Sequence, residues 1–292
     1  MELKIPRKKT YCKWKPISFL SLIDPNTKIS GYFNGFSVLV QNTAIMKELH
    51  TKGCFGKANL SRSYPSHQNS TEIIRKRVYD RRKTWGLNNK EKKKIIVVPD
   101  SDSEDDYFNN LKSEYCIDTS SLKEVLALSL EEAYFLHAIN CLNIYQQEEL
   151  LNGKSVWTLF TKTDKYFSQN YVVYQYFRFK NWIVKPGIKF GGDYLLYKDG
   201  PAFYHASYLV IIDVLDQKTL QRNHNMVRRS MEATNMIALN RLCETVGKEL
   251  LICQILWPEE ITTLEFQNLN KITINEVVMR RWILSENREL KS

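Results

Sequence analysis

Residues 186–212 concentrate the side chains that could carry acid–base chemistry. This stretch contains His205 and, eight residues before it, Tyr197. Between them the Asp-Gly-Pro segment 199–201 must reverse the chain, because Gly tolerates positive φ and Pro cannot continue a hydrogen-bonded ladder. We therefore expect Tyr197 and His205 on the two arms of one tight connection, close enough to act on one substrate.

A third candidate is Lys248, which lies between a predicted helix and a predicted strand. The helix ends at Gly247, a suitable C-cap, and an apolar strand covers 250–256. A lysine at this junction is placed like a site residue at the mouth of a sheet. Because Tyr and His are also common packing residues and Lys is commonly solvated, these residue types alone leave a structural role open.

The sequence has no pattern typical of a metal centre or a disulfide framework. Its six cysteines include no C-x-x-C pair and have no nearby His at ligand spacing, so we expect small buried hydrophobes. The carboxylates of Asp193, Asp199 and Asp213 are isolated, whereas a two-metal nuclease needs clustered carboxylates. We expect a site that uses no metal and no other cofactor.

Composition indicates a globular protein with an anionic partner. The 292 residues are 43% hydrophobic and 25% charged, which is enough for two domains with modest cores. The net charge of +10 suggests a polyanion, but the excess lies mainly in the front third of the chain. No apolar run approaches the roughly 20 residues that cross a bilayer. We expect a soluble, intracellular protein that makes no membrane contact.

Changes in composition predict a charged linker, and the order of the predicted elements, helices followed by a mixed sheet with one crossing helix, indicates an α+β fold. We expect an N-terminal domain in two parts, residues 1–70 and 119–156, a linker over 71–118 and a second domain over 157–292. The linker has basic runs, which could serve nuclear targeting or RNA binding, and an acidic run in which Ser101 and Ser103 are plausible phosphorylation sites. Opposed charge blocks are also usual in solvated linkers.

Hydrophobic periodicity predicts the elements that position the candidate residues. A capping box is expected at Ser121–Glu124. Helices are predicted near 42–50, 129–151, 156–180 and 231–246. Strands are predicted within 31–40 and near 182–186, 192–197, 202–214, 250–256 and 272–284. The aromatic residues of the third helix are expected in the core.

Longer stretches resemble a known family. The segment YVVYQYFRFKNWIVKPGIKFGGDYLLYKDGPAFYHASYLVII (171–212), followed by the helix and Lys248, resembles the catalytic domain of tRNA-splicing endonuclease subunits. The front stretches YFNGFSVLV (32–40), KGCFGKANLSRSYP (52–65) and LSLEEAYFLHAINCLNIY (128–145) are similar to the larger catalytic subunit of the eukaryotic enzyme. The resemblance implies a tRNA-intron-endonuclease-type domain over 157–292.

The resemblance also implies roles for five residues. Tyr197 would be the base, His205 the acid and Lys248 the stabiliser of transition-state charge, although Tyr197 and His205 could exchange roles. Arg241 and Trp282 would clamp a flipped base by cation–π stacking. Residue type alone favours a structural reading of both, with Trp282 as a strand core residue and Arg241 as a surface arginine.

The implied activity is metal-independent cleavage of precursor tRNA at the 5′ splice site, leaving 2′,3′-cyclic phosphate and 5′-hydroxyl ends, as in a tRNA-intron lyase. The implied assembly is a nuclear heterotetramer with another catalytic subunit and two structural subunits. Strands near 250–257 and 272–284 are candidates for pairing across an interface. The alternative is a non-catalytic structural or RNA-positioning subunit of the same complex.

Overall fold

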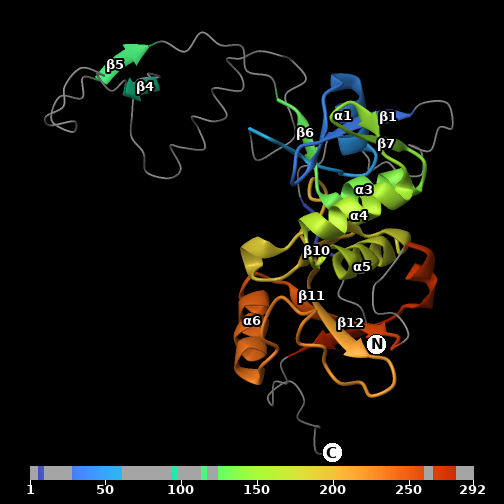
Figure 1. Cartoon of the computed structure of the whole chain (residues 1–292). Coiled ribbons are helices and arrows are strands. Elements are labelled where there is room, and N and C mark those ends of the chain that lie inside the picture. Colours follow the sequence, from blue (N-terminus) through green and yellow to red (C-terminus); the bar gives the residue numbers. More distant parts are fainter. Residues whose placement is uncertain are drawn as a thin grey trace, which may run out of the picture. The chain divides into compact units, whose positions relative to one another are not determined.

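The computed structural model describes residues 6–9, 28–60, 94–97, 113–116, 124–259 and 266–280 (Figure 1). The chain divides into two compact units, one formed by residues 1–56 and 127–292 and the other by residues 57–126. The second unit contains strands β3 (Lys57–Ala58), β4 (Lys94–Val97) and β5 (Ser113–Cys116), of which β4 and β5 pair antiparallel. The predicted domain boundaries stay a prediction, and Ser101 and Ser103 lie outside the described residues.

The first unit begins with a small mixed sheet. Strand β1 (Ile29–Phe33) pairs antiparallel with β2 (Val38–Val40) and parallel with β7 (Leu142–Gln146). Alternate residues of β1 are buried, as its sequence pattern predicts. Helix α1 (Thr43–Thr51) follows, and its N-terminus is capped by Asn42, whose side chain accepts from the Ala44 and Ile45 amides. The helix predicted near 42–50 is confirmed.

The single helix predicted over 129–151 is wrong. Helix α3 (Leu130–Ala138) is followed by β7 and by β8 (Glu149–Leu150), which pair antiparallel. Asn140 has φ 59°, and Gln147 and Glu148 in the turn have φ 46° and 71°. Pairing with β1 buries alternate residues of β7, so tertiary contacts override the helical spacing. The predicted capping box at 121–124 begins outside the described residues; the structure has one at Ser129 and Glu132, at the start of α3.

The predicted helix 156–180 is two helices, α4 (Gly153–Thr163) and α5 (Phe167–Phe179). Asp164 separates them in an extended conformation, and its carboxylate accepts from the Tyr166 amide at 2.9 Å. Of the aromatic residues predicted in the core, Tyr171, Tyr174 and Phe177 are buried, whereas Tyr176 is half-buried. Buried rings of α3, α4 and α5 form a cluster that packs mostly edge to face. The cluster comprises Tyr134, Trp157, Phe160, Phe167 and Tyr171.

The candidate site belongs to a five-stranded sheet in the order β13-β12-β11-β10-β9. Its strands are β9 (Ile183–Pro186), β10 (Tyr194–Tyr197), β11 (Tyr208–Asp216), β12 (Glu249–Trp257) and β13 (Thr273–Met279). Strands β11 and β12 run parallel and are joined through helix α6 (Ala233–Thr245), as a parallel pair requires a crossover. The α+β class is confirmed.

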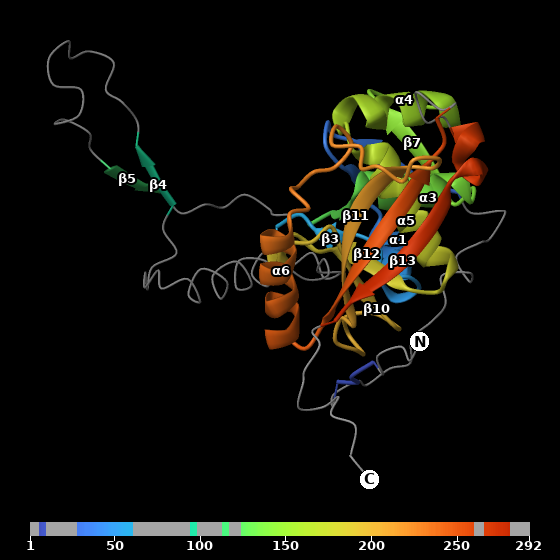
Figure 2. The same cartoon turned by 90° about the horizontal axis from the view of Figure 1, so that it is seen from below.

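Both faces of this sheet are covered. Figure 2 shows α6 beside one face of strands β11 and β12 and α5 beyond the other. On the α6 face, Met236 and Cys243 pack with Leu209 and Leu250. On the α5 face, the Tyr194 hydroxyl donates to a backbone carbonyl of α5 at 3.1 Å. Burial on both faces explains the nearly continuous apolar run of β11. No helix among the described residues is long and apolar enough to cross a bilayer.

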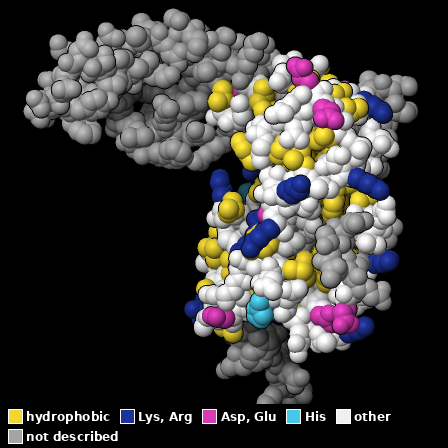
Figure 3. All heavy atoms as spheres, viewed as in Figure 1, with side chains coloured by type: hydrophobic (Ala, Val, Ile, Leu, Met, Phe, Trp, Pro, Cys, Tyr) yellow, Lys and Arg dark blue, Asp and Glu magenta, His cyan; other side chains and the backbone are white. Residues whose placement is uncertain are grey.

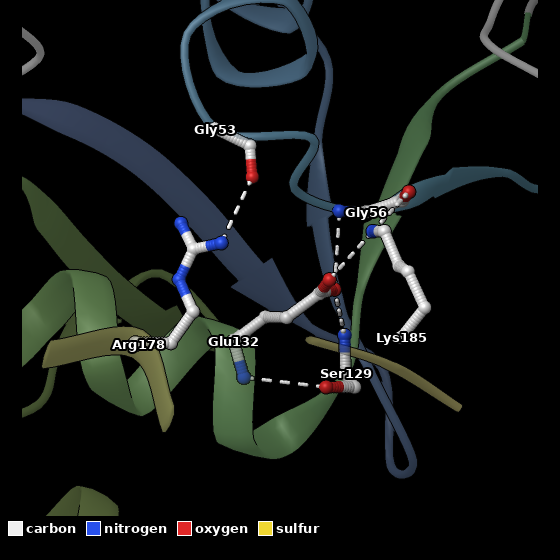
Figure 4. A network of polar contacts seen from close by, with 6 residues as sticks. All are labelled: Gly53, Gly56, Ser129, Glu132, Arg178 and Lys185. Carbon is white, nitrogen blue, oxygen red and sulfur yellow. Dashed lines mark hydrogen bonds and ion pairs between the residues drawn. The ribbon is translucent and has the colours of Figure 1, made fainter. Parts of the chain in front are cut away.

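A buried carboxylate joins the two halves of the first unit (Figure 4). Glu132, whose side chain is 7% exposed, accepts from the Ser129 and Gly56 amides, each at 3.1 Å. It also pairs at 2.9 Å with Lys185, which lies on β9. One carboxylate therefore connects helix α3, the loop after α1 and the five-stranded sheet.

Arg178 of α5 reinforces the same loop from the other side. Its guanidinium donates to the Gly53 carbonyl at 3.2 Å and lies 4.3 Å from the ring centroid of Phe55 (Figure 4). The side chain is almost fully buried. The negative face of an aromatic ring attracts a cation, so the contact with Phe55 offsets part of the cost of burying the guanidinium.

We predict that Glu132→Ala lowers the free energy of unfolding of the full chain by about 3–5 kcal/mol, because it leaves the Lys185 ammonium buried without its counter-ion. Chemical denaturation measures the change. Glu48→Ala is the matched control, since it breaks an exposed pair with Lys52 worth about 0.5 kcal/mol or less. Equal effects of the two substitutions would contradict the role assigned to Glu132.

Candidate active site

The structure brings Tyr197, His205 and Lys248 to one end of the strands of the five-stranded sheet, where β10 ends and β11 and β12 begin. We call this end of the sheet the site edge. Tyr197 is the last residue of β10, His205 precedes β11 and Lys248 directly precedes β12. Register fixes this arrangement, because Tyr208 at the start of β11 pairs with Leu196 on one side and with Glu249 on the other. Two consecutive strands and a third that follows α6 therefore bring these residues to the same end of the sheet.

Backbone hydrogen bonds continue the pairing of β10, β11 and β12 one residue beyond the start of β11. The Ser207 amide donates to the Leu196 carbonyl at 2.9 Å, and the Glu249 amide donates to the Ser207 carbonyl at 3.0 Å. The backbone between His205 and β11 is therefore tied to both neighbouring strands. Such bonds restrain the backbone that positions the candidate residues, as a reaction centre requires.

The connection between Tyr197 and His205 is longer than the tight turn predicted. Strand β11 begins at Tyr208, so the strand predicted from residue 202 is wrong over its first residues. Gly200 has φ 113°, and its carbonyl accepts from the Phe203 and Tyr204 amides. These bonds form a local turn, so the chain after β10 does not pair as a strand. A Cβ on Gly200 would lie 2.6 Å from the Cys54 sulfur, so only glycine fits against the loop after α1.

Tyr197 and His205 differ in exposure. The Tyr197 ring is half-buried and packs against the apolar cluster between α6 and the sheet. This burial raises the pKa of Tyr197, so the phenol keeps its proton at neutral pH. The His205 side chain is exposed, and its backbone amide donates to the Arg7 carbonyl at 3.0 Å.

Lys248 is positioned by the end of α6. Gly247, with φ 67°, ends the helix, and the Lys248 amide donates to the Cys243 carbonyl at 2.8 Å. The ammonium donates to the Val246 carbonyl at 3.2 Å and lies 4.3 Å from the ring centroid of Phe190. The helix thus ends at the predicted glycine, which directly follows the C-cap residue Val246.

Two of the isolated carboxylates have structural partners. Asp213 is 1% exposed at its side chain and makes a bidentate pair with Arg222 at 2.7 and 3.0 Å. Asp193 pairs with Arg229 and accepts from the Ile212 amide, both at 2.8 Å. These pairs anchor the connection between β11 and α6. Among the described residues, no three His, Cys, Asp or Glu side chains form a cluster that could hold a metal.

The structure describes one of the two predicted clamp residues. Arg241 is exposed on α6, whereas Trp282 lies outside the described residues. On the face drawn in Figure 3, Lys and Arg side chains are spread among other residues, and Asp and Glu lie toward its two ends. The distribution of charge therefore does not indicate a nucleic-acid site on this face.

The N-terminal basic arm, residues 6–9, contacts the segment that carries His205. The sequence did not predict this contact. Lys8 forms an antiparallel bridge with Tyr204, and the Lys9 amide donates to the Phe203 carbonyl at 2.8 Å. The Lys9 ammonium donates to the Pro201 carbonyl at 2.6 Å. The basic run Arg7-Lys8-Lys9 is the only feature of this arm visible in the sequence, and it does not identify a partner segment so distant in the chain.

Sequence comparisons place these elements in a known context. Residues 29–157 match the family model of the tRNA intron endonuclease N-terminal domain, and residues 167–263 match that of the tRNA intron endonuclease catalytic C-terminal domain. Tyr197, His205 and Lys248 all lie within the second match. Together the two matches cover most of the chain.

Several curated relatives are similar to this chain. It is 40% identical to tRNA-splicing endonuclease subunit Sen2 of Mus musculus over 169 residues, which are 56% of this chain and 36% of the relative. It is 35% identical to Sen2 of Gallus gallus over 205 residues, 68% of this chain and 44% of the relative. The probable subunit sen2 of Schizosaccharomyces pombe is 24% identical over an alignment of 312 positions, which covers 86% of this chain and 79% of the relative.

The chain spans less than half the length of the two vertebrate relatives. Its matches nevertheless include both characteristic domains of one family, in order along the chain. The first match contains β1, β2 and β7 of the small mixed sheet, and the second contains β9 to β12 of the five-stranded sheet. The chain therefore belongs to the tRNA intron endonuclease family.

Proposed function

We propose that this chain is the catalytic subunit of a tRNA-splicing endonuclease that cleaves precursor tRNA at the 5′ splice site. The observation that carries the proposal is the convergence of Tyr197, His205 and Lys248 at the site edge. Relatives named as Sen2 subunits of tRNA-splicing endonuclease support the substrate class. The resemblance of residues 32–40, 52–65 and 128–145 to the larger catalytic subunit supports the choice of splice site.

The reaction needs only groups that this edge supplies. The 2′-oxygen attacks the adjacent phosphorus, an O2′–P bond forms and the bond from phosphorus to the 5′-oxygen breaks. The products are a 2′,3′-cyclic phosphate and a 5′-hydroxyl. A base must take the 2′-OH proton, an acid must protonate the 5′-oxygen and a cation must stabilise the extra negative charge on phosphorus.

We assign Tyr197 as base, His205 as acid and Lys248 as the stabilising cation. Burial raises the pKa of Tyr197, so its phenolate has to be stabilised when RNA binds. Lys248 suits that task, because a lysine remains charged at neutral pH and its flexible stem lets the ammonium leave the Val246 carbonyl. His205 is exposed and can reach an RNA leaving group.

The proposed assembly is a nuclear heterotetramer with another catalytic subunit and two structural subunits. Strand β13 lies at one edge of its sheet, and Val277 on it is 41% exposed, which suits an intermolecular contact. Arg241 and Trp282 would clamp a base for the active site of a neighbouring subunit. A non-catalytic positioning subunit is the alternative, and the complete Tyr-His-Lys set favours catalysis over it.

We predict that His205→Ala in the reconstituted complex slows 5′ cleavage by about 100- to 10,000-fold, because the leaving oxygen loses its proton donor. Cleavage at the 3′ site should continue. Both cuts are measured separately on end-labelled precursor tRNA, with exposed His224→Ala as the matched control. Survival of both cuts would refute the site assignment, and loss of both in an intact complex would refute one site per subunit.

A substrate with a bridging sulfur in place of the 5′-oxygen separates the roles of acid and base. A thiolate leaves with little protonation because its conjugate acid has a pKa of about 8.5. We predict that this substrate restores most of the cleavage lost in His205→Ala and little of that lost in Tyr197→Phe. Single-turnover rates measure the rescue. The reverse pattern would make Tyr197 the acid and His205 the base.

Cleavage should continue in excess EDTA, because side chains supply the base, the acid and the cation. We expect single-turnover rates within about threefold of those without chelator, provided that spermidine keeps the tRNA folded. The assay uses precursor tRNA freed of divalent ions. A strict requirement for magnesium in the chemical step would contradict the mechanism.

A further inference from the structure

The N-terminal arm, residues 6–9, forms an isolated antiparallel bridge with the segment that carries His205. Its two backbone bonds flank the Lys8–Tyr204 bridge: the Lys9 amide donates to Phe203, and Arg7 accepts from the amide of His205 itself. Paired backbone groups fix the orientation of both segments. The arm therefore restrains the residue to which we assign proton donation.

The arm also brings cations to this edge. The side chains of Arg7 and Lys8 are exposed, while Lys9 is held by the Pro201 carbonyl at 2.6 Å. Lys198 lies in the same connection, with its ammonium 5.5 Å from the ring centroid of Tyr204. The facing acidic group on that connection is the half-buried Asp199. Exposed cations beside a reaction centre for RNA favour contacts with backbone phosphates.

We propose that the arm has two roles: its backbone positions His205, and Arg7 and Lys8 bind phosphates of the precursor tRNA next to the scissile bond. The inference rests on the proposed function, because it takes His205 as the proton donor. It assigns to residues 6–9 a part in the active site, although residues 29–157 and 167–263 are the family matches.

The phosphate role is tested by binding, which does not require cleavage. The complex is titrated with precursor tRNA carrying a 2′-deoxy nucleotide at the 5′ splice site, over a series of salt concentrations. Each phosphate contact adds roughly 0.7–0.9 to the slope of log affinity against log salt. We expect the double variant Arg7→Gln/Lys8→Gln to lower the slope by about 1–2 and to weaken binding about tenfold at low salt.

The matched control is the double variant Lys47→Gln/Lys162→Gln, which removes two exposed lysines from helices α1 and α4. It should change affinity by less than about twofold at low salt. If the arm variant keeps the wild-type slope, or if the control lowers it equally, the phosphate role is wrong. Reduced assembly with partner subunits and an unchanged slope would make the arm a protein contact instead.

The positioning role is tested with two substitutions at Lys9. Lys9→Pro removes the amide hydrogen donated to Phe203, whereas Lys9→Gln keeps it and loses only the ammonium contact with Pro201. At saturating precursor tRNA we expect Lys9→Pro to cleave about tenfold more slowly than Lys9→Gln. The difference should shrink with the 5′-thio substrate, because that leaving group bypasses the acid.

Equal single-turnover rates for the two Lys9 variants would overturn the positioning role. A deficit in Lys9→Pro that persists with the 5′-thio substrate would also overturn it, because the arm would then act on the general stability of the site. If the wild-type complex does not cleave precursor tRNA at all, the proposed function fails, while the salt series still decides whether the arm binds phosphates.

Discussion

The buried carboxylate of Glu132 is the interaction on which the arrangement of the first unit depends. It holds the Gly56 amide and Lys185 together, and so fixes the loop after α1 against the five-stranded sheet. In that loop Cys54 has φ 54° and its sulfur lies directly against Gly200. The N-terminal half of the unit therefore supports the connection between Tyr197 and His205. Loss of the Glu132 contacts would therefore disturb the candidate site indirectly, through the packing of Cys54 against Gly200.

Local sequence chemistry predicted the elements that are governed by local interactions. The helix near Asn42, the helix end at Gly247 and the aromatic core all follow from residue types and their spacing. The helix expected over 129–151 failed because β7 is held by a parallel pairing with β1, more than 100 residues earlier in the chain. Helical and strand spacings both fit its apolar residues, and only the partner strand decides between them.

The candidate site likewise combines features that local sequence predicts with features that depend on distant strand pairing. Tyr197 and His205 could be paired from their positions around one turn, and Lys248 from its place between a helix and a strand. That the three lie at the same end of the sheet follows from the order of β10, β11 and β12, which local spacing does not encode. The arm beside His205 could not be predicted at all, because backbone hydrogen bonds carry that contact and they leave no mark on residue type.

Orientation and reactivity make opposite demands on Tyr197. Packing against the core fixes its ring, but the same burial raises the pKa of its phenol and opposes the role of base. A bound phosphate would oppose deprotonation further, so the charge balance has to be restored by cations. Lys248 lies at the same edge, and in our proposal Arg7 and Lys8 reach it as well. The cations that bind RNA there would also favour the phenolate, which couples substrate binding to activation of the base.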